Sequence, residues 1–176
     1  GEIAKNYLAV GKAKAQLPLG KMFLLAVLAG AYIALAGLGA SVASAGAESA
    51  GAGRLLSACV FPAGLTMVLL AGSELFTGNC LILIPVLHRE VSPAAFVRNL
   101  VVVYLGNTLG GILVAAGAVY SRIFDLFGSG MAAGAISTAA AKCALPFGIA
   151  FLRGIFCNLL VCLAVWMAMA AKDTAG

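Results

Sequence analysis

The chain has 176 residues, of which 63% are hydrophobic and only 10% are charged, and its mean hydropathy is +1.10. A water-soluble domain of this size cannot cover so much apolar surface, which excludes a soluble globular protein and makes lipid the solvent of most of the chain. The net charge is +5, but the basic residues lie at the ends of apolar runs rather than in one patch, so we expect no nucleic-acid partner.

The first segment, residues 1–20, is basic and weakly amphipathic. It carries Lys5, Lys12 and Lys14 between short apolar stretches, and Pro18 ends it. This pattern predicts a helix that lies along the cytoplasmic membrane surface. The remainder, residues 21–176, is predicted to be a single transmembrane domain. Its first span covers residues 22–47, enough for the roughly 20 residues that a helix needs to cross the hydrocarbon core.

The second apolar segment, residues 55–88, is too long for one straight crossing and is broken by polar residues and glycines over 73–79. We predict two half-helices joined by a loop at membrane depth, which is tolerated only where it faces protein or a water-filled path. Such a break aims helix ends at the midplane, where they can bind or steer an ion. The acid Glu74 at this depth indicates a functional site; the alternative is a polar kink that only packs helices.

The third span is predicted over residues 97–121 and contains the stretch YLGNTLGG. Asn107 needs a hydrogen-bond partner in hydrocarbon, while Gly106, Gly110 and Gly111 leave room for a neighbouring helix. We interpret this group as a helix-packing site.

The fourth span is predicted over residues 147–171. The connection before it is uncharged over residues 126–141 and rich in small residues, and we interpret it as an external loop with a short helix. Asn158 lies inside the span and is either an interhelical contact or part of a pore wall. Lys142 and Arg153 either attract anions to an entrance or mark the membrane interface with snorkelling side chains.

The distribution of Lys and Arg predicts the orientation. With the N-terminus inside, the cytoplasmic side holds Lys5, Lys12, Lys14, Lys21, Arg89, Arg98 and Lys172. The outer side holds Arg54, Arg122, Lys142 and Arg153. By the positive-inside rule, we expect a multi-pass protein of the cell inner (plasma) membrane with its N-terminus in the cytoplasm.

The sequence offers few candidates for catalytic or metal-binding residues. A membrane enzyme needs a convergent nucleophile and base or a set of metal ligands. His88 is the only histidine, and the five cysteines have neither CxxC spacing nor partner histidines, so we interpret them as buried apolar thiols. We therefore expect no enzymatic activity, no cofactor and no metal site.

Four stretches together resemble the formate/nitrite transporter family: AGAYIALAG, FPAGLTMVLLAGSELFTGNC, YLGNTLGG and FLRGIFCNLLVCLAVWMA, one in each span and in the family's order. The resemblance covers nearly the whole chain. It implies an all-α integral membrane protein, an aquaporin-like helical bundle with a broken second transmembrane helix, which is part of a six-span inverted-repeat fold. It also implies a homopentamer in which each protomer has its own pore.

The activity that the resemblance implies is a channel or transporter for small monovalent anions such as formate, nitrite, hydrosulfide, acetate or lactate, with passive or proton-linked flux. The alternative is an aquaporin-like channel for small neutral solutes, which predicts paired Asn-Pro-Ala half-helices that this sequence lacks.

Carried over by position, the resemblance implies a pore or substrate pathway formed by Phe61, Leu65, Leu75, Phe76, Thr77, Lys142 and Asn158. Phe76 and Thr77 match the narrow point of the pore, and Lys142 and Asn158 match a pair connected with anion attraction. The loop anchor that it implies consists of Glu74 with Gly72, Gly78 and Asn79.

The family fold has six spans, and this sequence contains the first four. The family's fifth-span motif, Glu-His-Ser followed by Ala-Asn, supplies a histidine at the centre of the pore and does not occur in this sequence; His88 lies instead at the cytoplasmic end of the second span. The expected partners are a small monovalent anion, the lipid bilayer, further copies of the chain and the remaining C-terminal spans.

Overall fold

The computed structural model describes residues 2–171, in which every regular element is a helix. In chain order these are α1 (Glu2–Ala15), α2 (Leu19–Ala45), α3 (Ala50–Val60), α4 (Ala63–Leu70), α5 (Phe76–Asn79), the 3₁₀ turn η1 (Cys80–Ile82), α6 (Leu83–Leu87), α7 (Pro93–Tyr120), the 3₁₀ turn η2 (Ile123–Asp125), α8 (Gly130–Cys143) and α9 (Phe147–Ala168). Lys172, which contributes to the charge asymmetry above, lies outside the described residues.

Within residues 2–171, four helical segments are long and apolar enough to cross a membrane: α2, α3 with α4, α7 and α9. Local signals set their starts. Ser49 caps α3 by accepting a hydrogen bond from the Ala52 N–H at 3.2 Å. Ser92 caps α7, with Pro93 at the first helical position, where a missing N–H costs nothing.

The second span is broken at two places. Pro62 follows the end of α3, where it interrupts the backbone ladder and starts α4. The larger break comprises residues 71–75, here called the re-entrant loop. It is shorter than the predicted non-helical stretch 73–79, because the Asn79 N–H bonds to the Leu75 carbonyl at 2.9 Å and closes the helical turn α5.

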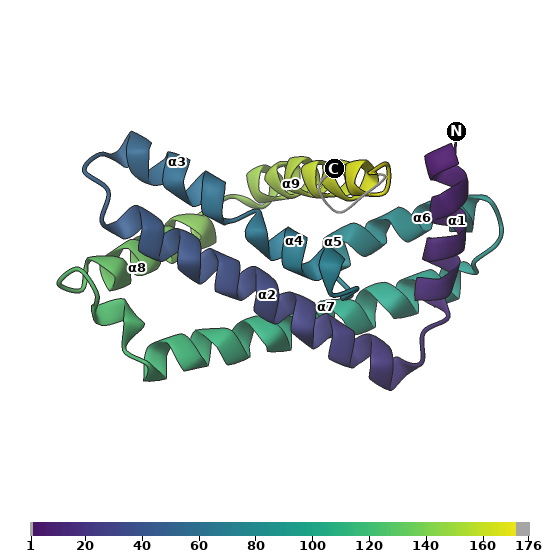
Figure 1. Ribbon diagram of the computed structural model, residues 1–176, viewed down its shortest axis with the longest axis horizontal. Helices are drawn as coiled ribbons and strands as arrows, with labels where there is room; N and C mark the ends of the chain where they lie inside the picture. Colours follow the sequence, from purple (N-terminus) through teal and green to yellow (C-terminus); the bar gives the residue numbers. More distant parts are fainter. Residues whose placement is uncertain (1, 172–176) are drawn as a thin grey trace.

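The pair α2 and α7 forms the framework of the molecule, and the two helices cross along much of their length (Figure 1). Glycines permit the close approach. A Cβ on Gly106 would lie 2.5 Å from the Ala26 Cβ, and a Cβ on Gly30 or Gly110 would overlap the backbone of the opposite helix. Gly111 has open space around it, so within the described residues no neighbouring helix occupies the room that it leaves.

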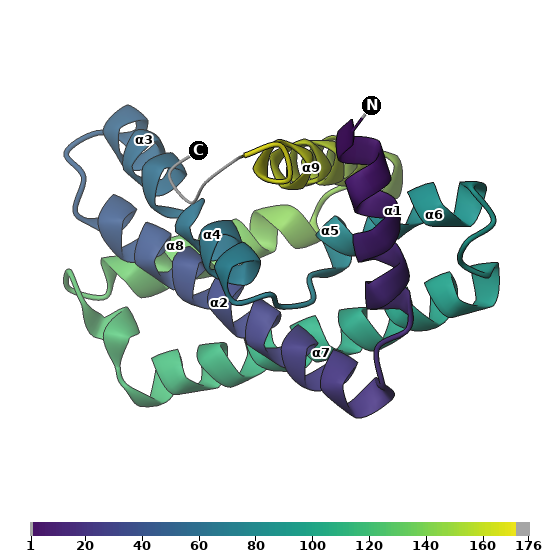
Figure 2. The ribbon, with the colours of Figure 1, turned by 45° about the vertical axis from the view of Figure 1, so that its right-hand side comes forward.

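The other helices surround this pair. α1 runs steeply across one end of the bundle, where α6 and the start of α7 lie, and α8 packs against α2 near the opposite end (Figures 1 and 2). α9 packs against α5 and meets α1 through Tyr7 and Trp166, whose ring centroids are 6.5 Å apart. The re-entrant loop and α5 therefore lie between α1, α4, α7 and α9.

Candidate functional site

The re-entrant loop begins with a helix stop. Gly72 adopts a left-handed conformation with φ +61°. The Ser73 N–H returns to the Val68 carbonyl at 3.0 Å, and the Gly72 N–H returns to the Leu69 carbonyl at 3.2 Å. This pair of bonds is a Schellman motif, which satisfies the last carbonyls of α4 and turns the chain away from the helix axis.

Glu74 lies at the centre of a buried polar network and is only 2% exposed. Its Oε1 accepts from the Lys14 ammonium at 2.6 Å, and its Oε2 accepts from the Asn79 side chain at 2.7 Å. The Asn79 amide also donates to the Asn99 Oδ1 at 2.9 Å, and the Asn99 amide donates to the Lys14 carbonyl at 3.2 Å. Each oxygen of the buried carboxylate therefore has a hydrogen-bonding partner, which compensates its charge.

Asn107 holds the backbone of the loop from the side of α7. Its Oδ1 accepts from the Phe76 N–H at 2.9 Å, and its side-chain amide donates to the Glu74 carbonyl at 2.9 Å and the Ala26 carbonyl at 2.7 Å. The Glu74 N–H bonds to the Leu25 carbonyl at 3.3 Å. Asn107, interpreted from the sequence only as a packing residue, is thus a hydrogen-bonding partner of the loop as well as of α2.

Phe76 and Thr77 follow the loop. The Phe76 ring packs on the buried cluster of Met22, Ala26 and Val103, and it meets Tyr104 edge to face with centroids 5.6 Å apart. Thr77 is half-buried. The first turn of α5 is therefore fixed by apolar packing as well as by hydrogen bonds.

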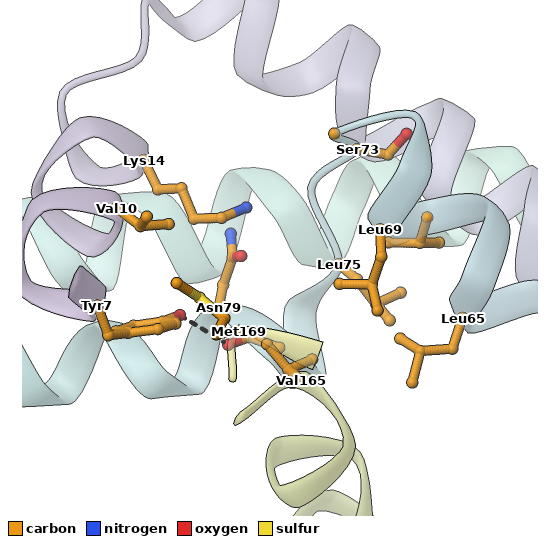
Figure 3. Close-up of a pocket in the computed structure, with 13 residues that line it drawn as sticks. Tyr7, Val10, Lys14, Leu65, Leu69, Ser73, Leu75, Asn79, Val165 and Met169 are labelled. Atoms are coloured by element: carbon orange, nitrogen blue, oxygen red, sulfur yellow. Dashed lines mark hydrogen bonds between the residues drawn. The ribbon is translucent and has the colours of Figure 1, made fainter. Parts of the chain in front are cut away.

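A cavity of about 240 Å³ lies against the loop, between α1, α4 and α9 (Figure 3). Its wall is mainly apolar and includes the side chains of Leu65, Leu69, Leu75, Val165 and Met169. Tyr7, Lys14, Ser73 and Asn79 supply the polar groups. The Ser73 hydroxyl is buried, with no hydrogen-bond partner among the described residues. Such a cavity suits a small solute that makes few polar contacts.

The structure brings some of the predicted residues to this cavity and not others. Leu65, Gly72, Leu75, Gly78 and Asn79 line it, whereas Phe61, Phe76 and Thr77 are absent from its wall as the described residues define it. Phe61 lies at the junction of α3 and α4 and is 47% exposed.

Lys142 and Asn158 also lie away from the cavity wall. Lys142 is exposed in the last turn of α8 and lines a separate cavity of about 480 Å³ between α2 and α8. Asn158 is half-buried on α9, and its Oδ1 is buried without a hydrogen-bond partner in the described part of the chain.

Sequence reasoning missed Lys14, Asn99 and Tyr7. Lys14 was assigned with the other basic residues to the membrane surface, although it is partly buried against Glu74. Asn99 could have been found from its position, because an amide inside the predicted third span needs a hydrogen-bond partner. Tyr7 has no comparable signal, since one tyrosine in an amphipathic segment is ordinary.

The cysteines differ from their interpretation as buried apolar thiols. Cys59, Cys143 and Cys157 are exposed and Cys80 and Cys162 are half-buried on this chain. Within residues 2–171, no three His, Cys, Asp or Glu side chains come together as a metal site would require.

The fold and the site define a class: a multi-pass, all-α membrane protein with a broken span whose loop is held by a buried polar network. Residues 1–176 match the family described as formate/nitrite transporter, and the chain belongs to that family. The resemblance read from the four spans and the predicted helical membrane fold are confirmed.

Three relatives illustrate the likeness. The probable formate transporter of Methanothermobacter thermautotrophicus is 39% identical over 195 residues, which cover 99% of this chain and 70% of the relative. A solved pentameric formate channel with formate bound has a TM-score of 0.80 and 36% identity, over 89% of this chain and 62% of that one. A solved ion channel of the same family has a TM-score of 0.85 and 31% identity, and the match covers 99% of this chain and 70% of that one. The chain thus spans about two thirds of the length of these proteins.

Proposed function

We propose that the protein is a channel or transporter for small monovalent anions, such as formate or nitrite, and that this chain supplies one wall of its pore. The observation that carries the proposal is the apolar cavity of about 240 Å³ beside a broken span whose loop is fixed by the Glu74 network. Family membership supports the same substrate class, because the related solved channel holds formate.

The apolar wall gives the proposed pore its selectivity. An ion that enters it must give up hydration, which costs several kcal/mol unless polar groups replace the lost water. Leu65 faces the cavity from α4, and Leu75 faces it from the re-entrant loop (Figure 3). We assign constrictions to Phe61, Leu65 and Phe76, and to the Thr77 hydroxyl the role of a hydrogen-bond donor for the anion.

Lys142 supplies positive charge on the side of the chain assigned to the outside. It is exposed beside the cavity between α2 and α8, so its field reaches solvent. A cationic group at an entrance raises the local concentration of anions. We propose this role for it in the outer vestibule.

Among the described residues, the buried Asn158 Oδ1 has no hydrogen-bond partner, although a buried amide oxygen normally has one. Asn158 lies one helical turn before Cys162, whose thiol contacts the Thr77 carbonyl, so both face α5. We propose that the partner comes from the family's fifth span, whose histidine would then stand near Thr77. Because imidazole titrates near pH 6.5, flux through such a pore would depend on pH and be linked to protons.

For the assembly we propose a homopentamer in the plasma membrane, with the N-terminus in the cytoplasm and with no enzymatic activity. The pentameric relative and the Lys and Arg distribution support this arrangement. Glu74 with Gly72, Gly78 and Asn79 is assigned to anchor the loop, and Gly106, Asn107 and Gly110 to hold α7 against α2 and the loop.

Liposome flux measurements test the proposal. The protein, with the family's fifth and sixth spans present, is reconstituted and exposed to gradients of formate, nitrite, hydrosulfide and glycerol. We expect at least one anion to move and glycerol to be excluded. Movement of glycerol alone would establish the neutral-solute alternative, and liposomes tight to all four solutes would refute a pore of either kind.

A further inference from the structure

Three consecutive carbonyls of α5 each accept a side-chain hydrogen bond. The Cys80 thiol donates to the Phe76 carbonyl, the Cys162 thiol to the Thr77 carbonyl and the Tyr7 hydroxyl to the Gly78 carbonyl, each at 3.4 Å. The donors come from three different elements, η1, α9 and α1. Since each carbonyl has a second lone pair beyond the helical bond, these contacts add to the helix rather than compete with it.

The Tyr7 bond lies in the wall of the cavity. Tyr7 and Gly78 both line it, and the hydroxyl points at the Gly78 carbonyl there (Figure 3). Tyr7 is only 1% exposed, and its ring is held against Trp166. Burial raises the pKa of Tyr7, so its hydroxyl keeps its proton and remains a donor.

The Cys162 bond holds the neighbouring carbonyl from the side of α9. The same helix contacts α5 one residue further on, because a Cβ on Gly78 would lie 3.5 Å from the Val165 side chain. α1 and α9 thus meet α5 at successive residues, each with one donor. Together they fix the tilt of this peptide segment.

These contacts carry an electrostatic consequence for an anion. A carbonyl oxygen has a partial negative charge, and in a low-dielectric cavity an uncompensated one repels an anion more strongly than it would in water. A hydroxyl or thiol donor offsets that charge and fixes where the oxygen points. Without the Tyr7 hydroxyl, the Gly78 carbonyl would have free acceptor capacity at the wall of this mainly apolar cavity.

We infer that Tyr7 and Cys162 are positioning residues for anion passage: the Tyr7 hydroxyl offsets the Gly78 carbonyl in the cavity wall, and the Cys162 thiol fixes the adjoining Thr77 carbonyl behind that wall. The inference rests on the proposed anion function, but it concerns affinity for the permeant rather than the existence of a pore. A change in affinity for the permeant would distinguish these two side chains from residues that only pack helices together.

Matched variants isolate the donors. Tyr7→Phe keeps the ring against Trp166 and removes only the hydroxyl. Cys162→Ala removes the second donor, and Cys162→Ser restores one. Tyr120→Phe and Cys157→Ala are controls, since Tyr120 is 89% exposed and Cys157 is exposed on α9. Each variant is reconstituted with the fifth and sixth spans present, and flux is measured against anion concentration with the amount of inserted protein normalised.

The readout is the half-saturating anion concentration, compared with the maximal rate. Loss of the Tyr7 bond at the wall, or of the Cys162 bond that fixes the preceding residue, is expected to raise that concentration about three- to tenfold. Cys162→Ser and both controls are expected to stay near the original value. A residue that only supports the fold would lower the maximal rate or the unfolding temperature and leave half-saturation unchanged.

Each outcome is decisive. Unchanged half-saturation in Tyr7→Phe, or equal behaviour of Cys162→Ala and Cys162→Ser, overturns the inference and leaves the proposed function intact. Absence of anion flux in the unaltered protein refutes the proposed function instead. If Tyr7→Phe fails to insert, the comparison of Cys162→Ala with Cys162→Ser decides by itself.

Discussion

Lys14 and Glu74 are 60 residues apart in the chain, and their side chains meet at 2.6 Å beneath the re-entrant loop. The carboxylate is almost fully buried, while the lysine side chain is 24% exposed. A carboxylate at this depth is tolerated because the ammonium and the Asn79 amide both bond to it. The N-terminal helix is therefore part of the site and not only a membrane-surface segment.

Breaking this pair on one side is expected to destabilise the protein by about 3 kcal/mol, since it leaves a buried charge uncompensated. Lys14→Met removes the ammonium and leaves the Glu74 carboxylate. The double variant, Lys14→Met with Glu74→Gln, removes both charges. The double variant is expected to recover a substantial part of the loss. Unfolding in detergent measures both. Additive losses in the double variant would show that the two side chains are not coupled.

Asn107→Leu removes three hydrogen bonds and leaves the Phe76 N–H and the Glu74 carbonyl unpaired. We expect a loss of about 3 kcal/mol in the free energy of unfolding, together with loss of flux. The matched control is Thr108→Val, because the exposed Thr108 bonds only within its own helix, to the Tyr104 carbonyl. Equal stability of the two variants would mean that the loop does not depend on Asn107.

Two adjacent glycines of α7 are expected to respond in opposite ways to alanine. Gly110→Ala places a methyl group on the α2 backbone and should prevent close packing, which lowers the unfolding temperature by several degrees or blocks insertion. Gly111→Ala meets open space and should be neutral or slightly stabilising, because alanine favours the helix. Similar thermal unfolding curves for the two variants would contradict the α2–α7 contact.

Thr77→Val keeps the size and branching of the side chain and removes its hydroxyl. If the hydroxyl donates to the permeant, anion flux should fall about tenfold with the unfolding temperature nearly unchanged, since one hydrogen bond in a dry site is lost. Thr77→Ser retains the donor and should retain most of the flux. Liposome assays of both variants decide the role, and normal flux in Thr77→Val would remove it.

The stability of the folded protein should depend on pH through Tyr7. Burial raises its pKa in the folded protein, so the folded chain holds the phenolic proton more tightly than the unfolded chain does. Its contribution is therefore complete below about pH 10, the ordinary tyrosine value, and is lost as the pH rises beyond it. Unfolding temperatures between pH 8 and pH 11 should fall more steeply in the unaltered protein than in Tyr7→Phe. Parallel profiles would place Tyr7 in contact with water.

The main features of the fold could be predicted because their signals are local. Apolar runs of membrane length locate the spans, and Gly72 and Glu74 in one such run indicate the break. The extent of the break could not be predicted: residues 76–79 are poor helix formers, yet packing of Phe76 and the bond from Asn79 to Leu75 make them helical. Tertiary contacts outweighed propensity there.

The partners of the loop could not be predicted for a related reason. Asn107 bonds to backbone groups 31 and 33 residues earlier in the chain, and a backbone partner has no sequence signature. Lys14 has the composition of a surface residue, and only the geometry shows that it pairs with Glu74. The positions of Phe61 and Lys142 away from the cavity likewise depend on how the helices cross.

The long sequence separations in the loop's network have a consequence for the order in which the protein is made. A nascent chain enters the membrane from its N-terminal end, so the broken span arrives before α7, which carries Asn99 and Asn107. Until then the Glu74 carbonyl and the Phe76 N–H lack the amide that satisfies them, and unpaired groups of this kind are not stable in hydrocarbon. We therefore expect the loop to reach its final position only after the third span is present, because α7 carries the amide that pairs with its backbone.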